Sequence, residues 1–220
     1  MPAPQTYPWK DPKSITYAGL AVLAFDVVWA SLGLLMQLLW GPRADFEGAP
    51  PGTLTPVQFA AATHATFGLV SLLGGVVLVF WILRVSKNAY ALKGRRLANS
   101  PLFAALWWYL IPFMSLIKPL ESMSEIWDVS AVDATRRRQN RAALGVWWAA
   151  LLISSALTYL SSVIRHVGVL IDLKWTASIV QSLAFAYVMK RIYDMQLEKH
   201  PVVEFSDAEQ PMSVLSQIAG

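Results

Sequence analysis

The stretch from Tyr17 to Trp40 is almost wholly apolar and carries a single charged residue, Asp26. A helix of this length reaches about 36 Å, which exceeds the thickness of about 30 Å of the hydrocarbon core of a bilayer. The composition agrees with a membrane environment, because 55% of the residues are hydrophobic and only 15% are charged. Soluble domains carry about 25% charged residues. The sequence therefore predicts an all-α integral membrane protein.

Three further apolar stretches are long enough to be spans, at about 57–83, 142–164 and 173–188. A fourth, at 101–119, is apolar as well but contains Pro112 in its middle. Proline removes one helical hydrogen bond and clashes with the preceding turn, so this segment is predicted to kink or break.

The distribution of positive charge indicates whether the segment around Pro112 crosses the membrane. If it crosses, the 18 lysines and arginines divide evenly between the two sides. If it enters and returns, only Arg43, Arg165 and Lys174 face outward. Positive residues gather on the cytoplasmic side of membrane proteins, which favours the second arrangement. We predict four transmembrane helices, both termini in the cytoplasm, and a Pro-broken re-entrant or interfacial hairpin.

The predicted organisation has three parts. Residues 1–16 form a cytoplasmic N-terminal arm, residues 17–190 a single transmembrane helical domain, and residues 191–220 a polar cytoplasmic tail. Cysteine is absent, which excludes disulfides, thiolate metal sites and cysteine nucleophiles. The net charge of +4 is modest, and no binding of nucleic acid is predicted.

Uncommon residues follow one another in a defined order between Phe80 and Trp127. A Trp and an Asn precede a basic loop and a Pro, an aromatic pair leads into Ile-Pro, and a basic residue with Pro precedes a Met and a closing Trp. The positions are Trp81, Asn88, Arg95, Pro101, Trp107, Trp108, Pro112, Lys118, Pro119, Met123 and Trp127.

This pattern, with the later pair Trp147 and Trp148, resembles bacterial membrane proteins of domain-of-unknown-function family 4328. The resemblance covers about residues 75–190. It implies a location in the bacterial cytoplasmic membrane and an important hairpin around Pro112, and it brings no activity that could be transferred.

Asp26 is a carboxylate inside an apolar span. Its insertion costs about 2.5–3.5 kcal/mol on insertion scales, so such groups face a partner or a wet cavity. One interpretation is a proton or cation site. The other, which we favour, is a structural pair with a basic residue near the inner face.

Two histidines, His64 and His166, are predicted near the outer ends of different spans. Neutral imidazoles from two helices can ligate a haem iron axially. Gly68, Gly74 and Gly75 would admit a flat ligand, but small residues equally permit close packing of helices.

Four arginines, Arg136, Arg137, Arg138 and Arg141, lie directly before a predicted span. Such clusters attract the head groups of anionic lipids, at about 1 kcal/mol for each residue. The lipid bilayer and its anionic lipids are therefore expected partners. Small residues four apart, including Ser154 and Ser178, are predicted to pack helices within this chain or against another subunit.

No phosphate-binding loop, glycine-rich dinucleotide fingerprint or zinc-protease motif is present in the sequence. We therefore predict a non-enzymatic multi-pass membrane protein that is an accessory or assembly subunit of a larger membrane complex, with no metal. One alternative is a small transporter or channel component that uses Asp26 and the Pro112 segment, because broken helices line many transport sites. The other is a haem b electron carrier that uses His64 and His166.

Overall fold

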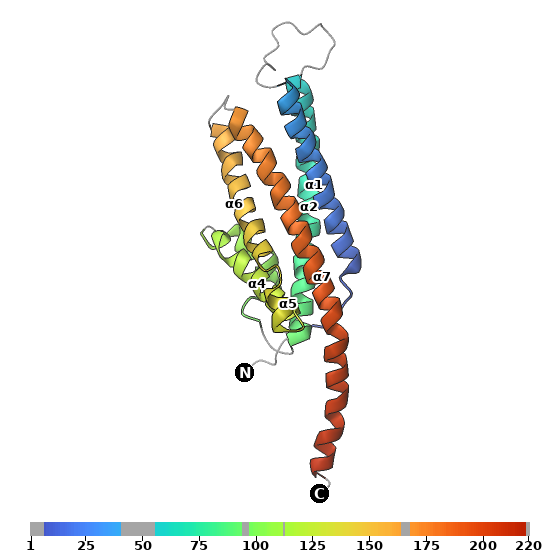
Figure 1. Ribbon diagram of the computed structural model, residues 1–220. Coiled ribbons are helices and arrows are strands. Elements are labelled where there is room, and N and C mark those ends of the chain that lie inside the picture. Colours follow the sequence, from blue (N-terminus) through green and yellow to red (C-terminus); the bar gives the residue numbers. More distant parts are fainter. Residues whose placement is uncertain (1–6, 41–55, 94–96, 112, 164–167, 219–220) are drawn as a thin grey trace. The chain divides into compact units, whose positions relative to one another are not determined.

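The computed structural model describes residues 7–40, 56–93, 97–111, 113–163 and 168–218 (Figure 1). Side chains are described for these residues except at 36, 37, 40, 56–71, 108, 161, 162, 168, 171 and 202–218. The described residues form helices joined by turns and irregular segments, with no β-strand among them. This confirms the predicted all-helical class.

Four long helices correspond to the four predicted spans. They are α1 (Lys13–Trp40), α2 (Pro56–Lys93), α6 (Ala142–Val163) and α7 (Gly168–Ile218). Three of them extend clearly beyond the predicted apolar stretches. Helix α1 begins four residues before Tyr17, α2 continues ten residues past position 83, and α7 continues through most of the predicted polar tail.

Three helical stretches within the described residues are long and apolar enough to cross a membrane. They are Lys13–Leu35, Leu72–Lys93 and Ala134–Leu160. Their length and composition support the membrane class that the sequence predicted.

Short helical elements connect α2 to α6. They are a π-helical turn (Phe103–Trp107), α3 (Trp108–Leu110), a 3₁₀ turn (Met114–Leu116), α4 (Lys118–Ser130) and α5 (Ala134–Arg138). Pro119 lies in the first turn of α4, where its missing N–H costs nothing. Asp133 caps α5, because its side chain accepts a hydrogen bond from the Arg136 N–H at 2.7 Å.

The chain divides into two compact units. Unit 1 comprises Met1–Thr16, Phe80–Arg141 and Met189–Gly220, and unit 2 comprises Tyr17–Val79 and Ala142–Val188. Of the 18 lysines and arginines, only Arg43, Arg165 and Lys174 belong to unit 2. The remaining fifteen belong to unit 1, so most of the positive charge of the chain lies in one of its two compact units.

Within unit 2, α1 packs closely against both α2 and α7. A Cβ atom added to Gly74 of α2 would lie 2.6 Å from Val22 Cγ1 of α1. A Cβ atom added to Gly33 of α1 would lie 2.7 Å from Trp175 Cε2 of α7. Both distances are far below van der Waals contact, so the absence of a side chain at these glycines is what permits the close approach.

Helix α6 lies beside α7 in unit 2 (Figure 1). The hydroxyl oxygens of Ser154 and Ser178 are 3.1 Å apart and share a hydrogen bond. The rings of Trp147 and Phe185 stack with their centroids 4.7 Å apart. The predicted stripes of small residues thus meet inside this chain at Ser154 and Ser178.

The apolar core of unit 1 is formed by side chains from α2, α4 and α7. The large, fully buried members are Trp81, Val85, Met123, Ile126, Trp127, Met189, Ile192 and Met195. In α4 the buried residues fall at helical spacing, so this short helix turns one face toward the core. Glu121 of the same helix is exposed. Each large apolar side chain buried in this way stabilises the fold by about 1.5–3 kcal/mol.

Candidate functional site

Asn88 lies at the centre of a buried polar network in unit 1, and its side chain is fully buried. Its amide forms two hydrogen bonds with the backbone of Lys10: the Lys10 N–H donates to Asn88 Oδ1 at 3.3 Å, and Asn88 Nδ2 donates to the Lys10 carbonyl at 2.9 Å. Asn88 Nδ2 also donates to Gln196 Oε1 at 3.3 Å. Asn88 therefore joins the N-terminal arm and α7 to α2.

Gln196 of α7 extends this network to α4. It is fully buried, and its Nε2 donates to the Val85 carbonyl at 2.9 Å and to Ser130 Oγ at 3.1 Å. Ser130 Oγ in turn donates to the Ile126 carbonyl at 2.7 Å. A buried polar network is favourable only when its donors and acceptors have hydrogen-bond partners. The side-chain amides of Asn88 and Gln196 both have such partners.

The N-terminal arm is held against unit 1 by aromatic contacts as well. The rings of Tyr7 and Tyr90 meet edge to face at 5.4 Å, and Trp9 stacks on His200 at 4.3 Å. The arm is thus part of the unit from residue 7 onward.

Two tryptophans of the sequence pattern are buried hydrogen-bond donors in unit 1. Trp81 Nε1 donates to Thr16 Oγ1 at 3.1 Å, and both residues are fully buried. Trp127 is fully buried too, and its Nε1 donates to the Arg137 carbonyl at 3.0 Å. A buried indole N–H requires such a partner, and both of these indoles have one.

The helical path breaks around Pro112, as predicted. Helix α3 ends at Leu110, and Ile111 is extended with φ −85° and ψ 118°. This is the conformation that a following proline imposes. Pro112 itself lies outside the described residues, and Phe113 beyond it has a φ of 63°. Regular α-helix therefore ends at Leu110 and a 3₁₀ turn begins at Met114, so the predicted break is confirmed.

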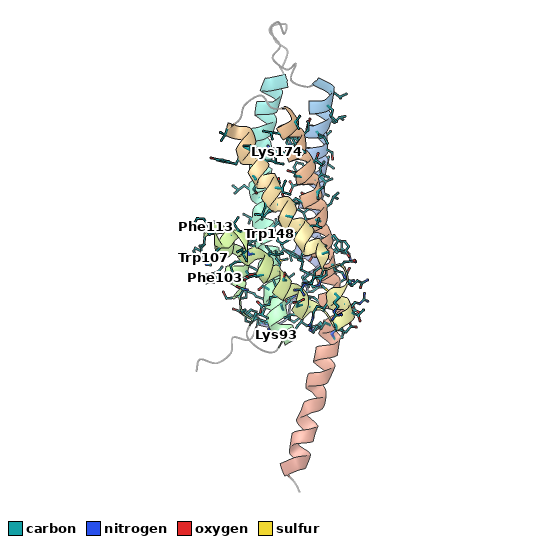
Figure 2. The ribbon with its side chains drawn as sticks, turned by 60° about the vertical axis from the view of Figure 1, so that its left-hand side comes forward. Lys93, Phe103, Trp107, Phe113, Trp148 and Lys174 are labelled. Atoms are coloured by element: carbon teal, nitrogen blue, oxygen red, sulfur yellow. The ribbon has the colours of Figure 1, made fainter. Side chains whose placement is uncertain are left out.

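The broken segment exposes many large apolar side chains. Nine of them are exposed: Leu102, Phe103, Trp107, Leu110, Ile111, Phe113, Met114, Leu116 and Ile117. Phe113 is 82% exposed, and Figure 2 shows it with Phe103 and Trp107 on the same side of the unit. We call residues 102–117 the apolar hairpin. An apolar surface of this extent indicates contact with lipid or with another protein.

Glu125 of α4 holds the base of the apolar hairpin. Its Oε1 accepts from the Ala98 N–H at 2.7 Å, and its Oε2 accepts from the Asn99 N–H and from Asn99 Nδ2, both at 3.3 Å. Lys93 Nζ lies 3.8 Å from Glu125 Oε1. One carboxylate therefore ties α4 to the end of α2 and to the backbone that leads into the hairpin.

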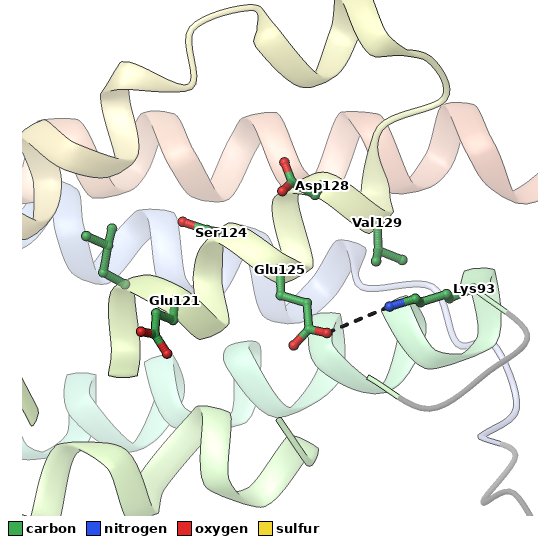
Figure 3. A pocket seen from close by; sticks show the side chains of 7 residues that line it. Lys93, Glu121, Ser124, Glu125, Asp128 and Val129 are labelled. Carbon is green, nitrogen blue, oxygen red and sulfur yellow. Dashed lines mark ion pairs between the residues drawn. The ribbon is translucent and has the colours of Figure 1, made fainter. Parts of the chain in front are cut away.

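A pocket of about 510 Å³ opens beside this contact (Figure 3). It is lined by Lys93, Leu120, Glu121, Ser124, Glu125, Asp128 and Val129. Each of its carboxylates is engaged: Glu121 with Lys118 at 2.6 Å, Glu125 with Lys93, and Asp128 with Arg141 at 3.1 Å. Among the described residues, no group of three histidine, aspartate or glutamate side chains is placed to hold a metal ion.

Asp26 lies in the middle of α1 in unit 2, and its side chain is half-buried. No hydrogen bond or ion pair joins its carboxylate to another residue whose side chain the structure describes. The expected structural pair with a basic residue is thus not formed within the described part of the chain, so the role of Asp26 stays a prediction.

The predicted haem ligands fall outside what the structure describes. His64 belongs to α2, but its side chain is not among the described ones, and His166 lies in the undescribed segment 164–167. Of the two glycines whose surroundings are described, Gly74 approaches Val22 of α1, whereas an added Cβ at Gly75 would meet nothing within 4 Å. The haem hypothesis stays a prediction, which an absorption spectrum of the purified protein would test.

Sequence reasoning identified Asn88, Trp81 and Trp127 from their order along the chain but did not identify Gln196 or Ser130. These two residues lie in polar surroundings in the sequence, where nothing distinguishes a buried amide or hydroxyl from an exposed one. Their burial depends on which face α7 and α4 turn toward α2.

No curated protein and no solved structure matches this chain. A family model described as "Domain of unknown function (DUF4328)" matches residues 55–195. The match covers more than half of the 220 residues and includes the whole of α2, beyond the region of resemblance noted in the sequence. The chain belongs to this DUF4328 family.

Proposed function

We propose that the chain crosses the membrane four times, with unit 2 in the bilayer. The chain passes between the units at four points, after residues 16, 79, 141 and 188. The shortest of the four helical segments in unit 2 runs from 168 to 188. A helix of these 21 residues is about 31 Å long, enough for a hydrocarbon core of about 30 Å.

The charge division supports a cytoplasmic location for unit 1 and both termini. Fifteen of the 18 lysines and arginines belong to unit 1, and positive residues gather on the cytoplasmic side of the membrane. In this topology the apolar hairpin lies at the inner face of the bacterial cytoplasmic membrane and buries its exposed side chains in lipid. The lipid replaces water around side chains such as Phe113, which is the favourable direction of transfer.

Thiol labelling tests this topology without background, because the chain has no cysteine. Single cysteines replace Arg95, Arg137 and Asp45, and intact cells are treated with a membrane-impermeant reagent. We expect labelling of position 45 only. Labelling of position 137 from outside would contradict four spans and favour five.

For the function, we propose a non-enzymatic accessory or assembly subunit of a larger membrane complex. The observation that carries this proposal is the buried network of Asn88 and Gln196, which joins the N-terminal arm, α2, α4 and α7. These polar groups are used to hold helices in fixed positions, and the pocket carboxylates are engaged in ion pairs in the same way. Rigid placement of membrane helices is what a scaffold for other subunits requires.

Mild-detergent purification of the full chain, followed by native mass spectrometry, tests this role. We expect one set of membrane proteins bound at a fixed stoichiometry. Deletion of this chain should then lower the amount of that complex in native gels of the membrane. A protein that stays monomeric, or a complex whose amount does not depend on this chain, would contradict the accessory role.

The alternative of a transporter or channel component is favoured by one observation, the half-buried Asp26 without a partner among the described residues. Such a carboxylate could bind a proton or a cation in the membrane. The substitution Asp26→Asn separates the two roles. It should abolish proton- or cation-driven flux in proteoliposomes if Asp26 is a transport site, and it should leave complex assembly unchanged if the protein is only a scaffold.

A further inference from the structure

The segment from α5 to the start of α6 is held firmly in unit 1. Asp133 caps its helix, the Arg137 carbonyl accepts from Trp127 Nε1, and Gln139 Oε1 accepts from Arg191 Nη2 at 2.6 Å. These contacts involve both ends of the short helix and the turn that follows it. Side chains that project from this segment therefore start from a fixed backbone.

Two of the four arginines in this segment are neutralised by carboxylates. Arg136 Nη2 lies 3.2 Å from Glu198 Oε1, and Arg141 Nη2 lies 3.1 Å from Asp128 Oδ2. Their charges are thus already compensated within unit 1. A further anion would bind less well to Arg136 and Arg141 than to an arginine without a carboxylate partner.

The other two arginines, Arg137 and Arg138, are exposed. No hydrogen bond or ion pair joins either guanidinium group to another residue whose side chain the structure describes. Lys199 adds positive charge nearby, with its Nζ donating to the Val129 and Ala131 carbonyls at 2.6 and 3.1 Å. Burial, and then the positive charge of Arg137, lower the pKa of Lys199. Among the side chains that the structure describes, no carboxylate therefore compensates the positive charges of Arg137 and Arg138.

The position of this pair along the chain points to lipid. Helix α6 begins at Ala142, only four residues after Arg138, and its 22 residues carry no charge. With unit 2 in the bilayer, as in the proposed function, the pair lies at the depth of the phosphate groups. An arginine fork matches phosphate oxygens and donates two hydrogen bonds to them.

We propose that Arg137 and Arg138 bind the head-group phosphate of an anionic phospholipid, whereas Arg136 and Arg141 are structural. This assignment divides a cluster that the sequence presents as uniform, and it rests on the four-span topology. The test is a titration of the full-length protein in detergent with fluorescent phosphatidylglycerol, with phosphatidylcholine as the neutral reference.

The double variant Arg137→Gln/Arg138→Gln should bind phosphatidylglycerol about thirtyfold more weakly, since each arginine near a membrane surface contributes about fivefold. Binding of phosphatidylcholine should not change. The matched control Arg136→Gln/Arg141→Gln removes the same charge and should lose less than about fivefold, the effect of a single arginine. Unchanged binding by the first variant, or equal losses in both, would overturn the proposal.

A second experiment adds inorganic phosphate at millimolar concentration as a competitor of the lipid. We expect it to leave phosphatidylglycerol bound, and displacement would show a site for free phosphate rather than for lipid. Both substituted residues of the first variant are exposed, so its elution profile and unfolding temperature should match those of the wild type. No partner protein takes part in this binding, so its failure is distinguishable from a failure of the accessory role.

Discussion

The side-chain Nδ2 of Asn88 donates to the side-chain Oε1 of Gln196 at 3.3 Å, across 108 positions of the sequence. Both side chains are fully buried, and each has further hydrogen bonds to backbone groups. This single contact joins the end of α2 to the cytoplasmic part of α7 in the proposed topology.

Replacement of Asn88 by alanine should destabilise the protein strongly. The substitution leaves Gln196 Oε1 and the Lys10 backbone without partners in a buried site, at a cost on the order of 2–3 kcal/mol. Unfolding in mixed dodecyl maltoside and SDS micelles measures this change. Thr135→Ala, at an exposed side chain of α5, is the control and should change the free energy of unfolding by less than about 0.5 kcal/mol. Equal effects of the two variants would contradict the role of the network.

Two adjacent glycines of α2 should differ sharply in their tolerance of alanine. At Gly74 the new Cβ would lie 2.6 Å from Val22 Cγ1, and the resulting overpacking should cost about 1–3 kcal/mol. At Gly75 nothing lies within 4 Å, so alanine should be neutral or stabilise by up to about 1 kcal/mol through its helix propensity. The same micelle unfolding assay compares them. A Gly74→Ala variant as stable as Gly75→Ala would show that α1 does not approach α2 at this point.

Lys199 should contribute to stability because it donates to the last carbonyls of α4. Its Nζ lies 2.6 Å from the Val129 oxygen and 3.1 Å from the Ala131 oxygen. Lys199→Met should therefore cost about 1–2 kcal/mol, less than for a fully buried donor. Lys190→Met removes an exposed pair with Asp194 and should cost no more than about 0.5 kcal/mol. If both lysines had the same small effect, the helix end would not depend on Lys199.

The tip of the apolar hairpin should lie in lipid in the intact protein. A polarity-sensitive fluorophore attached to Phe113→Cys in proteoliposomes should emit at shorter wavelength and be quenched by nitroxide-labelled lipid chains. The same label on Thr135→Cys, an exposed position of α5, should emit as in water and resist quenching. Emission typical of water at position 113 would mean that the hairpin is covered by neither lipid nor protein.

The all-helical class, the positions of the long helices and the break near Pro112 were all predictable from the sequence. Each depends on neighbours within a few residues: the apolar run from Tyr17 to Trp40 favours a long helix in a bilayer, and a proline disrupts the helix wherever it occurs. The order of Trp81, Asn88 and Trp127 was enough to indicate the family, but not to show what these side chains contact.

Other properties were decided only by the tertiary structure. The burial of Gln196, the difference between Gly74 and Gly75, and the division of the arginines into two paired and two exposed residues all depend on how the helices are rotated and which distant segments face them. A helix places neighbouring residues about 100° apart around its axis, so the adjacent Gly74 and Gly75 point to different surroundings. Local sequence determines the helix, whereas the packing of helices determines which of its residues are structural and which remain available for a ligand.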